Sequence, residues 1–145
     1  MNRAQRRKAR KTADGIAARF ASACYDYTPE GRLVRVTHPR AVALLEKAFA
    51  HMLRTGAKSH VVKLTQQDGD TFPRCKHNAL PYPAPYWLAV GLDPEGRGTY
   101  AMEQIDIRGA DAVTERRLAE AQVLARLARH TCYAGFPMPL TEGRA

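Results

Sequence analysis

The sequence predicts an α+β domain, with a small sheet of about four largely antiparallel strands and three helices packed mainly on one face. Three observations lead to this class. Helical and extended segments follow one another in a mixed order, the one clear hairpin is antiparallel, and 45% of the 145 residues are hydrophobic, an ordinary globular value. We divide the chain into a basic arm (1–12), one α+β domain (13–135) and an extended tail (136–145).

The chain begins with a predicted helix over residues 2–24. Its apolar stripe recurs at steps of three or four residues and consists of Ala13, Ile16, Ala17, Phe20 and Cys24. Gly15 follows Asp14 in the middle of this helix and weakens it there. We therefore expect the part before Asp14 to be frayed and basic, and the part after it to dock on the core.

The next segments are a loop (25–31), a short strand (32–36), a helix (39–53) and a second strand (60–64). Thr37 or His38 caps the helix, and Pro39 suits its first turn because that position needs no hydrogen-bonded amide. Gly56 supplies the left-handed residue that ends it. This helix has the strongest apolar face in the chain.

The second half begins with a turn (66–70), a proline-rich loop (71–85) and a strand (86–92). A tight turn (93–98), a returning strand (99–107) and a final helix (112–130) follow. The tight turn makes its two flanking strands a hairpin. We expect the final helix to bury a stripe of Leu118, Ala121, Leu124, Ala125 and Ala128. Arg116 and Glu120, one turn apart, fall on its outer side.

The positive charge is concentrated at the N-terminus. The formal net charge is +9, and the first eleven residues contain no acid but six basic residues, which are Arg3, Arg6, Arg7, Lys8, Arg10 and Lys11. The rest of the chain has a net charge of only +3. A basic arm on a nearly neutral body is typical of a tether to a polyanion, and the alternative is a solvated tail that only aids solubility.

Several classes of protein are disfavoured by the sequence. No stretch approaches the 18 uninterrupted apolar residues of a membrane span, and no apolar segment typical of a secretory signal follows the basic start. The cysteines (Cys24, Cys75, Cys132) are odd in number and far apart, which favours a reducing cytoplasm. Neither a Gly-x-Ser-x-Gly elbow nor a Walker loop occurs. We therefore expect no enzymatic activity and no cofactor.

Two sets of residues have donors suited to a metal ion. Cys75, His77, His130 and Cys132 have the chemistry of a tetrahedral zinc site, but the one-residue spacing within each pair is shorter than usual. The alternative places Cys132 in the core and His130 at a helix end, and we favour it. Two nearby carboxylates, Asp68 and Asp70, could hold a hard cation, although a solvated turn is the more common role of such a pair.

The segment 80–87 combines aromatic residues with prolines, which hold the backbone extended. Tyr82 and Tyr86 are candidate anchors for a protein partner or for stacking on unpaired bases, with Arg74 and Lys76 adding charge just before them. For Trp87, the only tryptophan, we favour a place in the core.

The run from Ala4 to Lys11 resembles the arginine-rich RNA-binding peptides of lambdoid phage antiterminators. Those peptides form a short helix on an RNA hairpin with their arginines on phosphates, and Arg6, Arg7 and Arg10 occupy matching places. The resemblance covers about a dozen residues. It implies RNA binding and a small accessory protein of phage or prophage origin.

We therefore predict a non-enzymatic nucleic-acid-binding accessory protein that contacts phosphates through its basic arm. The alternative is a phage-encoded inhibitor, similar in role to anti-CRISPR proteins, that binds a host effector or a ribonucleoprotein. Such an inhibitor needs no catalytic residues. It would not act by imitating DNA, because a mimic must be acidic and this chain carries +9.

Overall fold

The computed structural model describes residues 2–75 and 78–129 and confirms the α+β class. Its elements in chain order are α1 (Arg3–Ser22), β1 (Tyr25–Tyr27), β2 (Leu33–Arg35), α2 (Pro39–Thr55), β3 (Ser59–Leu64), α3 (Gln66–Gly69), β4 (Tyr86–Leu92), β5 (Gly98–Gln104) and α4 (Ala112–Ala128). None of the helices in this described part combines the length and the apolar character that a membrane crossing requires.

The strands form two antiparallel sheets rather than the one four-stranded sheet that we expected. β3, β4 and β5 make a three-stranded sheet in that order. At one end of this sheet Ser59 is opposite Gly91, and Leu92 is opposite Gly98. β2 pairs instead with β1, which lies in the segment predicted to be a loop. The residues of β1 have little apolar pattern, and they form a strand because β2 provides their hydrogen-bond partners.

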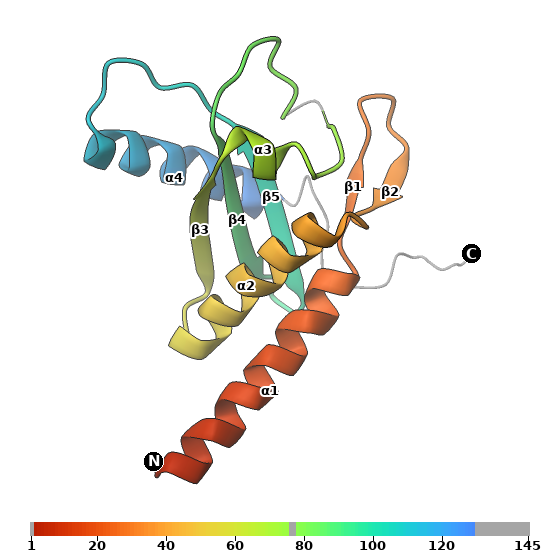
Figure 1. Cartoon of the computed structure of the whole chain (residues 1–145), viewed down its shortest axis with the longest axis vertical. Helices are drawn as coiled ribbons and strands as arrows, with labels where there is room; N and C mark the ends of the chain where they lie inside the picture. The colour runs from red at the N-terminus through yellow and green to blue at the C-terminus, as the bar shows by residue number, and fades with distance from the viewer. Residues whose placement is uncertain (1, 76–77, 130–145) are drawn as a thin grey trace.

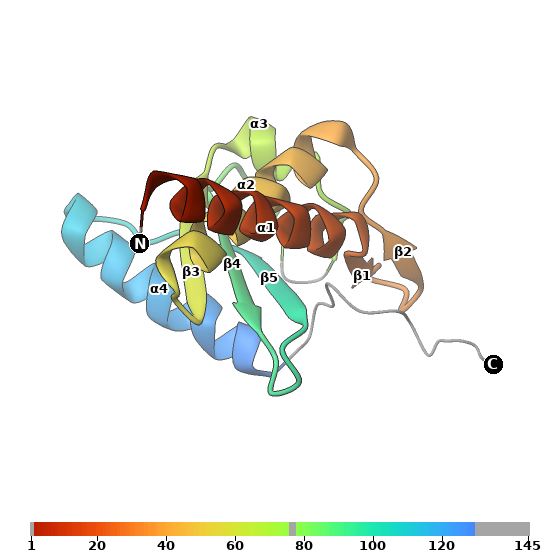
Figure 2. The same ribbon diagram turned by 90° about the horizontal axis from the view of Figure 1, so that it is seen from below.

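The long helices cover both faces of the three-stranded sheet (Figures 1 and 2). α2 packs on one face, and α1 packs on α2. α4 packs against β4 and β5 on the opposite face. The expectation that three helices lie mainly on one face is therefore correct for α1 and α2 and wrong for α4. Alternating side chains of the central strand β4 explain this, because both of its faces are apolar and both must be covered.

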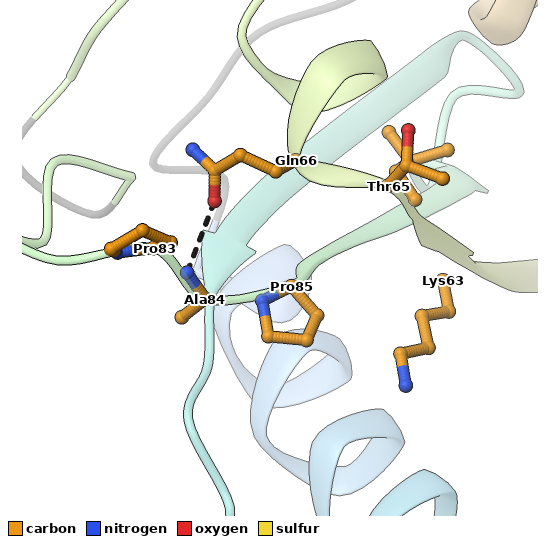
Figure 3. Close-up of a pocket in the computed structure, with 7 residues that line it drawn as sticks. Lys63, Thr65, Gln66, Pro83, Ala84 and Pro85 are labelled. Atoms are coloured by element: carbon orange, nitrogen blue, oxygen red, sulfur yellow. Dashed lines mark hydrogen bonds between the residues drawn. The ribbon is translucent and has the colours of Figure 1, made fainter.

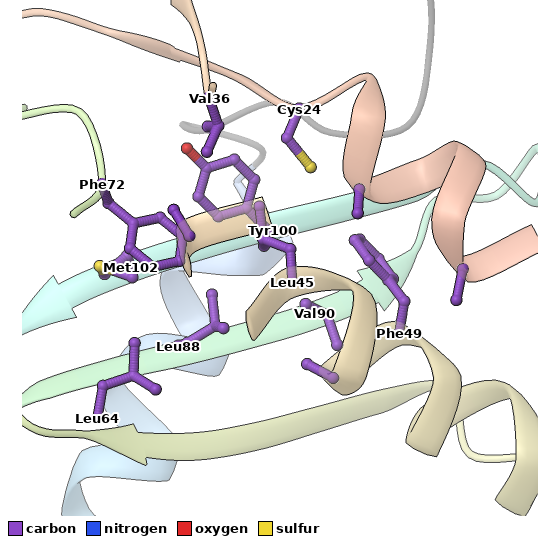
Figure 4. Close-up of a cluster of buried hydrophobic side chains, with 14 of the residues drawn as sticks. Cys24, Val36, Leu45, Phe49, Leu64, Phe72, Leu88, Val90, Tyr100 and Met102 are labelled. Atoms are coloured by element: carbon purple, nitrogen blue, oxygen red, sulfur yellow. The ribbon is translucent and has the colours of Figure 1, made fainter. Parts of the chain in front are cut away.

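The larger core lies between α2 and the sheet (Figure 4). Leu45 and Phe49 from α2 meet Leu88, Val90 and Tyr100 from the strands. The Tyr100 hydroxyl donates a hydrogen bond of 3.0 Å to the buried carboxylate of Asp26, which ties the β1–β2 hairpin to the sheet. This long-range contact gives β1 its place.

The second core lies under α4 and contains Trp87, which is 1% exposed as expected. The buried stripe of α4 is Ala119, Val123 and Leu127. The predicted stripe is wrong: of its five residues only Leu124 is partly buried, and Leu118 is 47% exposed. The helix is rotated so that two polar residues, Gln122 and Arg126, reach the buried carboxylate of Glu103 at 3.0 and 2.7 Å.

The local signals around α2 are confirmed. His38 is the N-cap, and its Nδ1 accepts a hydrogen bond from the Arg40 amide. Pro39 occupies the first helical position, and Gly56 ends the helix with a φ of 73°. The turn predicted at 66–70 forms the short helix α3, in which Gly69 is required because a Cβ there would lie 2.0 Å from the Tyr86 ring.

Candidate functional site

One face of α1 changes from alanine to arginine along its length. Ala13, Ala17 and Ala21 are buried, and small side chains at this spacing let the helix lie close to α2. Steps of three and four residues continue the same face toward the N-terminus through Arg10, Arg6 and Arg3. The face that docks on the body in the second half of α1 therefore carries guanidinium groups in the first half.

The change comes where α2 ends. α1 extends beyond the C-terminal end of α2, so that its first turns project from the body (Figure 1). Every residue from 2 to 12 is exposed. We call residues 3–12 the basic half of α1, and at 1.5 Å per residue it is about 15 Å long. Charged side chains suit these positions because the positions are exposed.

The basic half is helical, so the expectation of a frayed arm is wrong. Asn2 and Gln5 form a capping box, with hydrogen bonds of 2.8 Å in both directions, that satisfies the first free amides. The helix runs without interruption through Gly15. Asp14, one residue earlier, pairs with Arg54 of α2 at 2.6 Å and links the two helices at this point.

The helical repeat spreads the six cations over most of the surface of the basic half. On a helix of 3.6 residues per turn they span an arc of about 200°. Arg3, Arg6 and Arg10 continue the docking face, and the remaining three, Arg7, Lys8 and Lys11, extend the arc around the outer side. No acidic residue lies within residues 2–13. A single helix therefore presents positive charge in several directions.

Two hollows adjoin this surface. One, of about 310 Å³, runs along the helix between Arg3, Arg6, Arg7, Arg10, Lys11 and Asp14. The other, of about 480 Å³, lies between α1 and the last turn of α2, where Arg54 faces Arg6 and Arg10. The body thus contributes a cation next to those of α1.

A different hollow, of about 460 Å³, lies where β3 ends and the proline-rich loop returns to the sheet (Figure 3). It is lined by Leu64, Pro83 and Pro85, and by the aliphatic part of Lys63 at one edge. The Gln66 side chain accepts a hydrogen bond from the Ala84 amide and holds the loop. Its lining is mainly apolar, with the Thr65 hydroxyl and the Lys63 side chain as its other polar groups.

The predicted aromatic surface is present only in part. Tyr82 is 42% exposed, and the Arg108 guanidinium lies 5.6 Å from the centre of its ring. Tyr86 is 1% exposed, so its predicted role in stacking or partner binding is wrong. The strand β4 turns its ring into the core, where burial and a 2.7 Å hydrogen bond from its hydroxyl to Asp70 raise the pKa of Tyr86 to about 12.

Of the charged residues expected beside these rings, Arg74 is exposed and donates to the Asn78 carbonyl at 3.3 Å, and Lys76 lies outside the described residues. This loop is at the end of the molecule opposite the basic half of α1 (Figure 1). The two predicted binding elements therefore do not form one surface.

The predicted metal donors are not assembled within the described residues. His77, His130 and Cys132 lie outside them, and Cys75 is buried. Asp68 instead accepts two hydrogen bonds from Arg40, whose guanidinium lowers the pKa of that carboxyl. In residues 2–75 and 78–129, no three His, Cys, Asp or Glu side chains are grouped to hold a metal ion.

His51 of α2 and His60 of β3 form a stacked pair, with ring centroids 4.1 Å apart. Burial, followed by the neighbouring His51 and Arg116, lowers the pKa of His60. The sequence indicates no such pair, because the two residues are nine positions apart in different elements. The same holds for Asp14 and Arg54, whose pairing depends on how α1 crosses α2.

Comparison with known proteins finds no family model, no curated protein and no solved structure that matches the chain. Its function is therefore inferred from the geometry and charge of its own residues.

Proposed function

We propose that the protein binds nucleic acid through the basic half of α1, as a non-enzymatic accessory factor. One observation supports this above all. Six cations lie on a capped helix that projects from the body, and no acid interrupts them. A flexible tail would have to become ordered on binding, whereas a helix already formed loses less conformational entropy.

The dimensions of the basic half suit a nucleic-acid groove. An α-helix with its side chains is about 10–12 Å wide, and the major groove of B-form DNA is about 12 Å wide. Phosphates line both walls of such a groove, and cations spread over an arc of about 200° reach both walls at once. An RNA hairpin offers the same contacts where a loop or bulge opens its deep and narrow groove.

The arginines carry the geometric part of the recognition. A guanidinium group donates two parallel hydrogen bonds to the oxygens of one phosphate, which a lysine ammonium does not. Arg6 and Arg10 lie one turn apart on the same face, and Arg7 lies about 100° around the helix from Arg6, so Arg7 addresses a different phosphate from the other two. Lys8 and Lys11 add positive charge between them.

The salt dependence of binding follows from the number of cations. If all six contact phosphates, the slope of log K against log salt is about −5 for duplex DNA and about −4 for a single strand. Between 50 and 200 mM salt the affinity for duplex DNA then falls about 10³-fold. This dependence is the quantitative signature of the proposal.

The test is a titration of the full chain against a DNA duplex, a single-stranded DNA and an RNA hairpin at several salt concentrations. The variant R6Q/R7Q/R10Q leaves three cations in the basic half, so its affinity for duplex DNA should fall only about 40-fold over the same salt range. A matched control, R19Q/R32Q/R117Q, removes the same charge from exposed positions elsewhere.

The proposal requires the control to keep the wild-type slope while the first variant loses about half of it. Equal slopes for the two triple variants would mean that only net charge matters, and would refute a role for the helix. No salt-dependent binding to any of the three ligands would refute nucleic-acid binding and favour a protein target.

A further inference from the structure

The cleft between the basic half of α1 and the last turn of α2 has an unusual lining. Its rim carries three guanidinium groups, two from α1 and one from α2, and its floor is made of small or apolar side chains. The lining residues are Arg6, Ala9, Arg10, Ala13, Leu53 and Arg54. Its volume of about 480 Å³ leaves room for a phosphate group between the two helices.

Arg54 already has an anion as its partner. Its Nη2 atom lies 2.6 Å from Oδ1 of Asp14, and both side chains are 45% exposed. An ion pair that water reaches this freely contributes little to stability. A phosphate, with its oxygens fitting the guanidinium fork, can therefore replace the carboxylate at small cost.

The end of a helix usually opposes an anion because its last carbonyl groups point outward. In α2 two of these last groups accept hydrogen bonds. The carbonyls of Met52 and Leu53 accept hydrogen bonds from the amides of Ala57 and Gly56, and the Thr55 hydroxyl donates to the carbonyls of His51 and Met52. The partial charge at the end of a helix amounts to about half a negative charge, so the three guanidinium groups leave the cleft positive.

We propose that this cleft binds one backbone phosphate of the nucleic acid, and that Asp14 competes with that phosphate for Arg54. The inference rests on the proposed function of α1. It adds a contact from the body of the protein, and it makes Asp14 an internal competitor that weakens binding. Release of Arg54 from Asp14 accompanies engagement of the ligand.

The experiment is a double-mutant cycle on the full chain with R54Q, D14N and the double variant. Each is titrated with the same DNA duplex, single-stranded DNA and RNA hairpin. R54Q should weaken binding and reduce the magnitude of the salt slope by about 0.9 on duplex DNA, the value of one phosphate contact. D14N should tighten binding about two- to fivefold, as expected for removal of an exposed ion pair.

The double variant decides whether Asp14 acts through Arg54. Without Arg54 the gain from D14N should shrink to that of a general change in charge. E46Q provides this reference, because Glu46 lines the adjoining hollow with Asp14 and Arg54 and its substitution removes the same charge. Far-ultraviolet circular dichroism and thermal unfolding check that each variant remains folded.

The outcomes separate the two proposals. If R54Q binds with the wild-type affinity and slope while R6Q/R7Q/R10Q loses binding, the cleft is refuted and the proposed function stands. An equal gain from D14N with and without Arg54 would refute the competition. If none of these chains binds any of the ligands, the proposed function itself fails.

Discussion

Gly15 is the position at which the stiffness of the candidate site can be changed without touching its charges. It lies within α1, and a Cβ built there meets no atom within 4 Å. Alanine in a helix interior is favoured over glycine by about 0.8–1 kcal/mol because the glycine backbone loses more freedom. Gly15→Ala should therefore raise the free energy of unfolding by about that amount, and the melting temperature by about 2–4 °C.

The same substitution should also change local motion. Gly15 lies two residues beyond the start of the docked half at Ala13, so an opening of residues 3–12 that spreads past this junction includes it. A gain of about 0.8–1 kcal/mol lowers the open population about four- to fivefold if opening includes residue 15. Amide hydrogen exchange of residues 3–12, followed by mass spectrometry, measures this population, and slower exchange in Gly15→Ala is the expected result.

Gly56→Ala is the matched control. A Cβ at Gly56 also meets nothing within 4 Å, but its φ of 73° lies in the left-handed region. Alanine there costs about 1–2 kcal/mol, so the same chemical change should destabilise the protein. If Gly15→Ala destabilises the protein as well, or leaves the exchange of residues 3–12 unchanged, the basic half is not a rigid continuation of the docked helix.

Two further predictions concern the body. Arg126→Met leaves the buried Glu103 carboxylate without its cation and should lower the free energy of unfolding in urea by about 3 kcal/mol. E103L/R126M should be close to wild type in stability. Equal losses of stability in the two variants would contradict a buried ion pair. Burial, His51 and Arg116 lower the pKa of His60, and Glu120 has a weaker effect in the opposite direction. As the pH falls below about 6.5, this histidine is therefore protonated first in the unfolded state. The free energy of unfolding should therefore fall with pH from that point, and His60→Gln should flatten this dependence if the histidine is its source.

The elements that could be predicted are those whose signals are local. A cap, a proline and a terminal glycine define α2 within its own 17 residues and their neighbours. The turn Asp93–Gly98 similarly predicts the β4–β5 hairpin, since its hydrogen bonds lie within a few residues. The run of cations in the basic half of α1 is visible for the same reason, although the sequence predicted it on a frayed arm and the structure has it on a capped helix.

The features that could not be predicted depend on contacts between distant segments. β1 becomes a strand through β2, and Tyr100 ties it to the sheet. The alanine-rich sequence of α4 leaves several apolar faces similar in hydrophobicity, and the buried Glu103 selects the one that brings Arg126 to it. Tyr86 and Tyr82 look alike in sequence, and only the direction of β4 places one ring in the core and the other on the surface.

The sequence by itself determined the α+β class, the strong helix, the hairpin and the concentration of charge at the N-terminus, because composition and short-range spacing are sufficient for each. Only the tertiary structure decided where that charge lies relative to the body. The first turns of α1 extend past the C-terminal end of α2. The alanine face of α1 is therefore buried against α2, whereas its arginine face projects from the body. The same crossing brings Arg54, from the end of α2, to Asp14 and the arginines of α1. The candidate site depends on the relative lengths of α1 and α2 and on how the two helices cross. No local sequence pattern predicts either feature.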